Sequence, residues 1–174
     1  MNQPAASITA DVHVSYHVFT VEDVEMGMID EPPAADWYPT DRLTGRGGIA
    51  YINSPGHTHV PLVTIQAWKD QPTPEEPGTW EVCGDVELIC RTGIVVLSDR
   101  LRFGRSDPLD LGFGPMVYHL RAYSRGHDRM RAVEDGDFDI DDEDALTHVE
   151  EYLLQLWPSR PIPGDALKPF ILDT

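Results

Sequence analysis

Short apolar runs with a period of two are the feature that most limits how this chain can fold. The stretch Ile8–Val21 reads ITADVHVSYHVFTV, and every second residue from Val12 to Val18 is valine or tyrosine. Alternation of this kind places every second side chain on one face of a β-strand. Further runs that we interpret as strands lie at 49–53, 59–68, 79–91 and 116–123. The sequence therefore predicts a protein built mainly from strands.

Turn-forming residues separate these runs. The 174 residues include 15 prolines and 14 glycines, with clusters such as Ser54-Pro55-Gly56 between apolar stretches. No helical pattern alternates with the strands, and no repeat of fixed period is visible. We predict an all-β fold over residues 1–174, a single antiparallel β-sandwich of about seven to nine short strands joined by long acidic loops. Prolines at 161, 163 and 169 predict an extended tail over 159–174.

Three segments need a closer interpretation. Glu150–Trp157 reads EEYLLQLW and has a helical composition, but it is short and Pro158 follows it, so we predict a strand. In Thr79–Arg91 we expect Trp80 and Val82 to point inward, with a bulge at Gly84. We predict a further strand at Ile94–Leu97, and we expect Leu101 and Phe103 to continue its alternation after Asp99-Arg100.

The two cysteines, Cys83 and Cys90, lie seven residues apart in one predicted strand. An odd separation places them on opposite faces, which argues against a disulfide between them. We interpret them as reduced thiols of a cytoplasmic protein. No segment has the ~20 apolar residues of a membrane span, and residues 1–11 lack the basic start and apolar core of a signal peptide.

Acidic residues dominate the charge. The chain has 30 acidic and 13 basic residues and a formal net charge of −17 at pH 7, against about 2–8 for a typical small domain. Such a chain is repelled by nucleic-acid phosphates and by anionic membranes, and is steered toward a basic protein surface. Simple solubility remains an alternative explanation of the charge.

The two signs of charge are separated along the sequence. Acids gather at 22–41, 70–87 and 134–151, whereas eight of the eleven arginines lie between Arg91 and Arg131. Segregation of this kind favours a binding face. Pairing between the two sets within the molecule explains the pattern equally well.

The densest acidic run, Glu134–Asp144, has the spacing of a calcium loop at Asp137, Asp139 and Asp141. The full motif fails, because the position that needs glycine holds Asp142 and the position that needs glutamate holds His148. We interpret the run as a solvated loop rather than a calcium site.

Histidines offer a second metal hypothesis. His57 and His59 would face the same way in a strand and could share a metal ion. A barrel site of this type needs a glutamate four or five residues later, where Val63 and Thr64 stand. His13 and His17 share a strand face in a similar way, and both pairs are also consistent with ordinary surface histidines. We predict no bound metal and no cofactor.

Catalytic motifs are missing from the sequence. It contains no nucleophile elbow, no Cys–His signature, no H-E-x-x-H and no phosphate-binding loop, since the glycines at 45–48 precede a strand and are followed by no lysine. Carboxylate pairs are too frequent among 30 acids to single one out. We therefore predict a protein that is not an enzyme.

Residues 12–124 resemble a known family. The stretch VHVSYHVFTVED at 12–23 is followed by GGIAYI at 47–52, SDRLRF at 98–103 and a strand of the form G-P-x-x-Y-x-L-R at 114–121. This order is similar to that of the competence protein J family, the inhibitors of a DNA-entry nuclease. The resemblance implies a small acidic β-rich protein that binds and blocks a nuclease. It ends near Gly126, and it assigns no binding residue.

Together these features predict an immunity-like or inhibitor-like protein that captures a basic enzyme, such as a nuclease or toxin, with its acidic loops. Two alternatives stay open, a metal- or ligand-binding β domain and a structural subunit of a larger assembly. Aromatic residues are frequent anchors in protein interfaces, so Trp37, Tyr38 and Trp80 are candidate contacts. The predicted partner-binding residues are Trp37, Tyr38, Asp135, Asp137, Asp139, Asp141 and Asp142.

Overall fold

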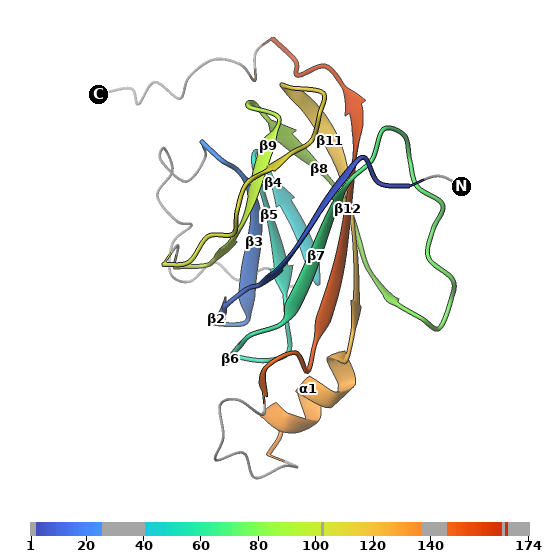
Figure 1. Ribbon diagram of the computed structural model, residues 1–174. Coiled ribbons are helices and arrows are strands. Elements are labelled where there is room, and N and C mark those ends of the chain that lie inside the picture. Colours follow the sequence, from blue (N-terminus) through green and yellow to red (C-terminus); the bar gives the residue numbers. More distant parts are fainter. Residues whose placement is uncertain (1–2, 26–40, 102, 137–145, 165, 167–174) are drawn as a thin grey trace.

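Two β-sheets pack face to face, and one short helix lies at one end of the sandwich (Figure 1). The computed structural model describes residues 3–25, 41–101, 103–136, 146–164 and 166. The predicted all-β sandwich is confirmed. Its elements are β1 (Ala6–Asp11), β2 (Val14–Ser15), β3 (Val18–Asp23), β4 (Leu43–Arg46), β5 (Ile49–Asn53), β6 (Thr58–His59), β7 (Leu62–Ala67), β8 (Glu81–Cys90), β9 (Ile94–Asp99), β10 (Leu109–Asp110), β11 (Met116–Arg125), α1 (His127–Glu134) and β12 (Glu151–Arg160).

The first sheet has the strand order β1-β7-β12-β11-β8, and the second contains β10-β9-β3-β2-β6. In the second sheet β3 also pairs with β5, which in turn pairs with β4. All of these pairs are antiparallel except β7 with β12, which run parallel. Nearly the whole architecture thus follows the antiparallel pattern that the sequence predicts.

The core lies between the inner faces of the two sheets. Leu120 of β11 and Leu154 of β12 are fully buried there, two strand neighbours on one inner face. Phe19 of β3 meets Tyr152 from the opposite sheet edge to face, with 5.0 Å between the ring centroids. Burying each of these side chains stabilises the folded state by about 1.5–3 kcal/mol. The apolar residues of the period-two pattern therefore hold the two sheets together.

Both faces of β12 are covered, which explains its nearly continuous apolar run. One face meets the core, and the other lies under the segment 69–80, where Gln155 donates to Oε1 of Glu75 at 3.2 Å. A strand buried on both sides loses the alternation that identifies a strand in sequence. The predicted strand is confirmed, and it continues past Pro158 to Arg160, with a register shift opposite Val117 and Tyr118.

The predicted single strand Ile8–Val21 is wrong. It is divided into β1, which joins the first sheet, and the hairpin β2–β3, which belongs to the second. Tyr16 and His17 form the hairpin turn with φ values of 52° and 68°. Paired positive φ values are typical of two-residue turns that usually contain asparagine or glycine. Here the turn residues are aromatic and continue the alternation, so the sequence pattern hides the turn.

The predicted bulge in β8 is confirmed. Gly84 pairs with Ala122, whereas the next pair joins Tyr123 to Val82, so Cys83 has no partner of its own in the ladder. Because of this extra residue, the side chains before the bulge point to the opposite faces from those that simple alternation predicts. Val82 is therefore 61% exposed. The expected inward orientation of Val82 is therefore wrong.

The same bulge changes the orientation of the cysteines. Cys83 packs against the core on the same side as the buried Cys90, so the expectation of opposite faces is also wrong. Both thiols are free. Burial raises the pKa of the Cys90 thiol to about 12, and it therefore remains protonated at neutral pH.

Some acids of the predicted loop 22–41 belong to β3 instead. Glu22 and Asp23 are fully buried at the end of this strand. Asp23 accepts backbone hydrogen bonds from Glu25 and Thr92, each at 2.9 Å. Glu22 forms an ion pair with Arg105 at 3.1 Å. These two acidic side chains are therefore buried and bind neighbouring loops instead of facing solvent.

Candidate functional site

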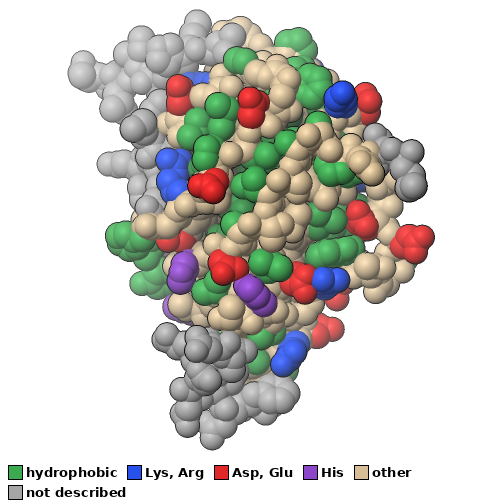
Figure 2. All heavy atoms as spheres, in the orientation of Figure 1, with side chains coloured by type: hydrophobic (Ala, Val, Ile, Leu, Met, Phe, Trp, Pro, Cys, Tyr) green, Lys and Arg blue, Asp and Glu red, His purple; other side chains and the backbone are tan. Residues whose placement is uncertain are grey.

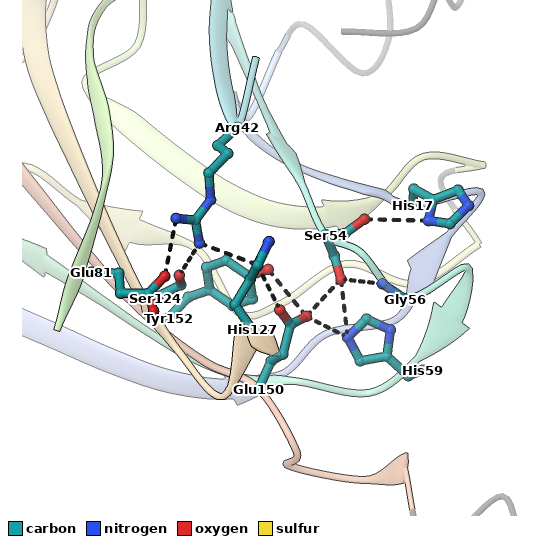
Figure 3. A network of polar contacts seen from close by, with 10 residues as sticks. All are labelled: His17, Arg42, Ser54, Gly56, His59, Glu81, Ser124, His127, Glu150 and Tyr152. Atoms are coloured by element: carbon teal, nitrogen blue, oxygen red, sulfur yellow. Dashed lines mark hydrogen bonds and ion pairs between the residues drawn. The ribbon is translucent and has the colours of Figure 1, made fainter. Parts of the chain in front are cut away.

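A buried carboxylate lies at the end of the sandwich that carries α1 (Figures 1 and 3). Glu150 immediately precedes β12 and is 0% exposed. Its Oε2 accepts hydrogen bonds from Ser54 Oγ at 2.6 Å, from Tyr152 Oη at 3.2 Å and from His59 Nε2 at 2.8 Å. Since an ionised carboxylate is costly to bury without partners, these donors account for its presence inside the protein.

The other oxygen of Glu150 faces the first residue of α1. Oε1 lies 3.2 Å from Nδ1 of His127, at ion-pair distance but without hydrogen-bond alignment. The same Nδ1 lies 3.1 Å from Nη2 of Arg42, which also donates to Ser124 Oγ. With a proton, Nδ1 of His127 can interact favourably with the Glu150 carboxylate. Without a proton, Nδ1 can accept a hydrogen bond from the Arg42 guanidinium. The same nitrogen cannot do both at once.

The histidines and the serine set the charge state of the carboxylate. Burial raises the pKa of Glu150, but the contacts with His127, His59 and Ser54 lower it further than burial raises it, to about 2. Glu150 is therefore ionised at neutral pH. Arg42 extends the network outward through an ion pair with Glu81 at 3.2 Å.

The network brings together parts of the chain that are distant in sequence. Arg42 precedes β4, Ser54 follows β5, His59 lies in β6, and Ser124 lies near the end of β11 (Figure 3). Met130 of α1 is fully buried, and its sulfur and the His59 ring both lie against Gly56. The network therefore ties both sheets and the helix together at one end of the molecule.

The segments on both sides of residues 137–145 are anchored to this end. On one side, Glu134 Oε1 accepts from the backbone N–H of His57 at 2.6 Å. On the other, the backbone N–H of His148 donates to the carbonyl of Val60 at 2.8 Å, and its Nε2 lies 2.6 Å from Asp11 Oδ1. The described segments on both sides of residues 137–145 are therefore held to the rest of the protein by hydrogen bonds.

Ser54, His59 and Glu150 include the residue types of a hydrolytic triad but not its geometry. In a triad the histidine uses one nitrogen for the nucleophile and the other for the acid. Here Nε2 of His59 approaches both Ser54, at 3.4 Å, and Glu150, while Nδ1 has no hydrogen-bond partner among the described residues. The side chains are also buried. The arrangement is therefore structural and offers no activated nucleophile.

The histidine pair of the metal hypothesis is divided. His57 is exposed and contacts the rings of Tyr16 and His17, with centroids 5.2 and 5.1 Å apart, whereas His59 is buried against Glu150. Within the described ranges, no group of three or more His, Cys, Asp or Glu side chains has a geometry that could hold a metal ion. The structure therefore does not bring His57 and His59 to one site.

One of the predicted partner-binding residues is described. Asp135 is exposed at the carboxyl end of α1, and its backbone N–H donates to the carbonyl of Arg131 at 2.9 Å. Trp80, named above as an aromatic anchor, is half-buried, with the guanidinium of Arg125 4.6 Å from its ring centroid. The other predicted contacts lie outside the described residues: Trp37, Tyr38, Asp137, Asp139, Asp141 and Asp142.

An exposed aromatic residue outside the predicted set is Phe103. It does not continue a strand as expected, because the chain turns after β9 and the side chain is 88% exposed. Asp99 is buried and fixes the turn, accepting from the backbone N–H groups of Phe103 at 3.0 Å and of Gly104 at 2.9 Å. Leu101 nearby is also exposed. Aspartate is a frequent turn residue, so Asp99 is the local signal in the sequence for this turn.

Comparison with known proteins supports the fold and no closer relationship. No protein-family model and no curated protein sequence matches the chain. Two solved structures are similar. One is ComJ from Bacillus subtilis, an inhibitor of the DNA-degrading activity of NucA, with a TM-score of 0.56 and 13% identity over 91% of this chain and 99% of that chain.

The second similar structure is described as crocagin biosynthetic gene J, with a TM-score of 0.53 and 14% identity over 89% of this chain and 99% of that chain. The resemblance to the competence protein J family is thus confirmed at the level of the fold. In the described part of the chain, no helix is long and apolar enough to cross a membrane.

Proposed function

We propose that this chain is a protein inhibitor that binds a nuclease and blocks it. The observation that carries the proposal is the shared fold with ComJ, which extends over 99% of that inhibitor and 91% of this chain. Fold alone does not fix function. The net charge of −17 adds a chemical reason, since nucleases that bind DNA phosphates need basic surfaces, which attract an acidic inhibitor.

We place the electrostatic contact on five acids of the run Glu134–Asp144, namely Asp135, Asp137, Asp139, Asp141 and Asp142. The fixed segments on both sides of this run support the choice, because a pre-organised base reduces the entropy lost on binding. Phe103 is a second candidate contact, as an exposed aromatic side chain on a turn held by Asp99. Aromatic anchors of this kind carry much of the binding energy in many interfaces.

The test begins with capture of nucleases from native lysate at low salt, followed by purification of each captured enzyme. We expect the chain to inhibit the DNA cleavage of a captured enzyme, with an association rate that falls at least ~10-fold between low and high salt. Captured proteins that keep full nuclease activity in the presence of the chain would refute the proposal. A salt-insensitive association rate would remove its electrostatic part.

Matched variants locate the contact. Asp→Asn changes at 135, 137, 139, 141 and 142 reduce the formal net charge from −17 to −12, by −17 + 5. A control with neutral amides at five exposed acids elsewhere (Asp41, Asp70, Glu76, Asp107 and Asp110) has the same formal charge. We expect only the first variant to slow association about 10-fold, because local charge steers the encounter. Equal slowing would indicate that total charge alone matters.

A second pair tests the aromatic contact. Phe103→Ala is expected to weaken inhibition at least ~10-fold, whereas Val82→Ala, at another exposed apolar position, leaves it unchanged. Unchanged inhibition by Phe103→Ala would remove this residue from the interface.

A further inference from the structure

β1 is an open edge of the first sheet. It pairs with β7 on one side, and no described strand pairs with its other side. The N–H groups of Leu62 and Trp68 donate toward β12, so the odd-numbered residues of β7 face β1. In the observed register these are opposite the even-numbered residues of β1. The backbone N–H and C=O groups of Ser7 and Thr9 therefore point outward.

Among the described strands, β10 lies close to β1 but forms no backbone pair with it. β1 runs across the side that faces the viewer in Figure 1, and Figure 2 shows the same side of the molecule with its atoms as spheres. An unpaired row of backbone donors and acceptors is a template for another strand.

The two edges of this sheet differ in how they are protected. β8, at the far edge, has the bulge at Gly84 and the exposed acids Glu81, Asp85 and Glu87, and its Ile89 N–H is occupied by the Gly47 carbonyl. Bulges and charges are common devices against edge-to-edge pairing. From Ala6 to Ala10, β1 reads ASITA, with no charge, no proline and no irregularity in its register with β7. Of the two described edges of this sheet, the β1 edge is the one that lacks these devices.

We propose that β1 pairs with β1 of a second copy of this chain, antiparallel and about a two-fold axis at Ile8. The outward groups require Ser7 to lie opposite Thr9 of the other copy, where each such pair exchanges two backbone hydrogen bonds. Ile8 then lies opposite its own copy, and Ala6 opposite Ala10. The pairing joins the two five-stranded sheets into one continuous sheet.

The sequence of β1 is what selects a second copy as the occupant. In this register no charged residue is opposite a like charge, since all residues from Ala6 to Ala10 are neutral. Small side chains at Ala6 and Ala10 allow the two backbones to approach, and Ile8 adds an apolar pair. A two-fold interface needs such self-complementarity. A basic enzyme, by contrast, gains nothing from the charge of this strand.

Salt separates this interface from the proposed inhibitor function. Two copies with a net charge of −17 each repel one another, so salt strengthens their association by screening. Binding of a basic enzyme weakens with salt. The dimer does not require the inhibitor function, and either can fail alone.

The experiment is light scattering and sedimentation of the purified full chain over a wide range of concentration, at about 0.05 and 0.5 M NaCl. We expect a dimer that dissociates on dilution and is tighter at the higher salt concentration. Ser7→Pro removes an outward N–H without removing a bond to β7, and should weaken the dimer at least ~10-fold. Ser7→Ala keeps the N–H and should dimerise like the native chain.

Cross-linking tests the register independently of the proline variant. Ile8→Cys places two thiols opposite each other across the axis and should give a disulfide-linked dimer on mild oxidation. Ala6→Cys, on the same strand face but opposite Ala10, should not. A native chain that is monomeric in all conditions, or a dimer unaffected by Ser7→Pro and not cross-linked through Ile8→Cys, would overturn the proposal. The proposal would also be overturned if β1 paired only with a captured enzyme. In that case the native chain would be monomeric, and Ser7→Pro would abolish its complex with the enzyme.

Discussion

At the scale of single residues, Glu150 shows how a strongly acidic chain can use an acid internally. This carboxylate is fully buried, with donors on Oε2 and the His127 ring beside Oε1. Removing one member of a buried ionic network leaves the remaining charges without compensation, which costs more than the loss of a surface pair. We therefore expect this residue to contribute more to stability than any exposed acid near it.

Glu150→Gln should destabilise the protein by about 3–5 kcal/mol at pH 7. The effect depends on pH, because the pKa of about 2 in the folded protein lies below the ordinary value of 4.5. The folded protein therefore binds this proton less tightly than the unfolded chain. Its stabilisation is complete above pH 4.5 and is lost as the pH falls from 4.5 to about 2. Urea unfolding at several pH values should show this loss in the native chain and a smaller one in Glu150→Gln.

The neighbouring residue provides the control. Glu151 forms a half-exposed ion pair with Arg125, and Glu151→Gln should cost no more than about 1 kcal/mol. Similar losses for the two variants would show that the buried network adds no special stability.

At the scale of elements, α1 is fixed to β12 through a glycine. Gly126 precedes the helix with a φ of 83°, and a Cβ there would lie 2.0 Å from the carbonyl oxygen of Val149. No side chain fits this close approach. The segment before Glu150 therefore packs directly on the start of the helix.

Gly126→Ala tests this contact, and Gly136→Ala provides a matched control. Gly136 has a similar φ of 81°, but a Cβ there would meet no atom of the described residues within 4 Å. Both changes cost about 1–2 kcal/mol for the left-handed backbone. We expect Gly126→Ala to lose at least ~2 kcal/mol more in urea unfolding, because its backbone contact must open. Equal losses of unfolding free energy in the two variants would mean that α1 moves away from Val149 without an energetic penalty.

Elements also show what the sequence could predict and what it could not. The alternation of apolar residues predicted strands, and the glycine at position 84 predicted the bulge. Both predictions succeeded because strands and bulges depend on local backbone geometry. The turn at Tyr16-His17 was missed because its residues lack turn chemistry and continue the apolar alternation. The network around Glu150 was missed for another reason. Its members come from segments that are far apart in the sequence, and only the fold distinguishes a buried acid from a solvated one.

At the scale of the whole molecule, the charge of −17 acts in two directions. The acids that hold loops, such as Asp23 and Asp99, have backbone donors and stabilise the fold. The exposed acids repel one another and oppose compactness. A basic partner that binds to this surface would relieve the repulsion between the exposed acids. This agrees with the proposed function.

The balance can be measured with salt. Raising NaCl from about 10 mM to 300 mM shortens the screening length from about 30 Å to less than 10 Å, which weakens repulsion across the surface but leaves buried pairs largely unscreened. We expect the melting temperature at pH 7 to rise by several degrees, since about 1 kcal/mol corresponds to about 2–4 °C for a chain of this size. The rise should vanish near pH 4.5, the isoelectric point of the sequence. A melting temperature that falls with salt at pH 7 would show that exposed ion pairs, such as Arg42 with Glu81, outweigh the repulsion.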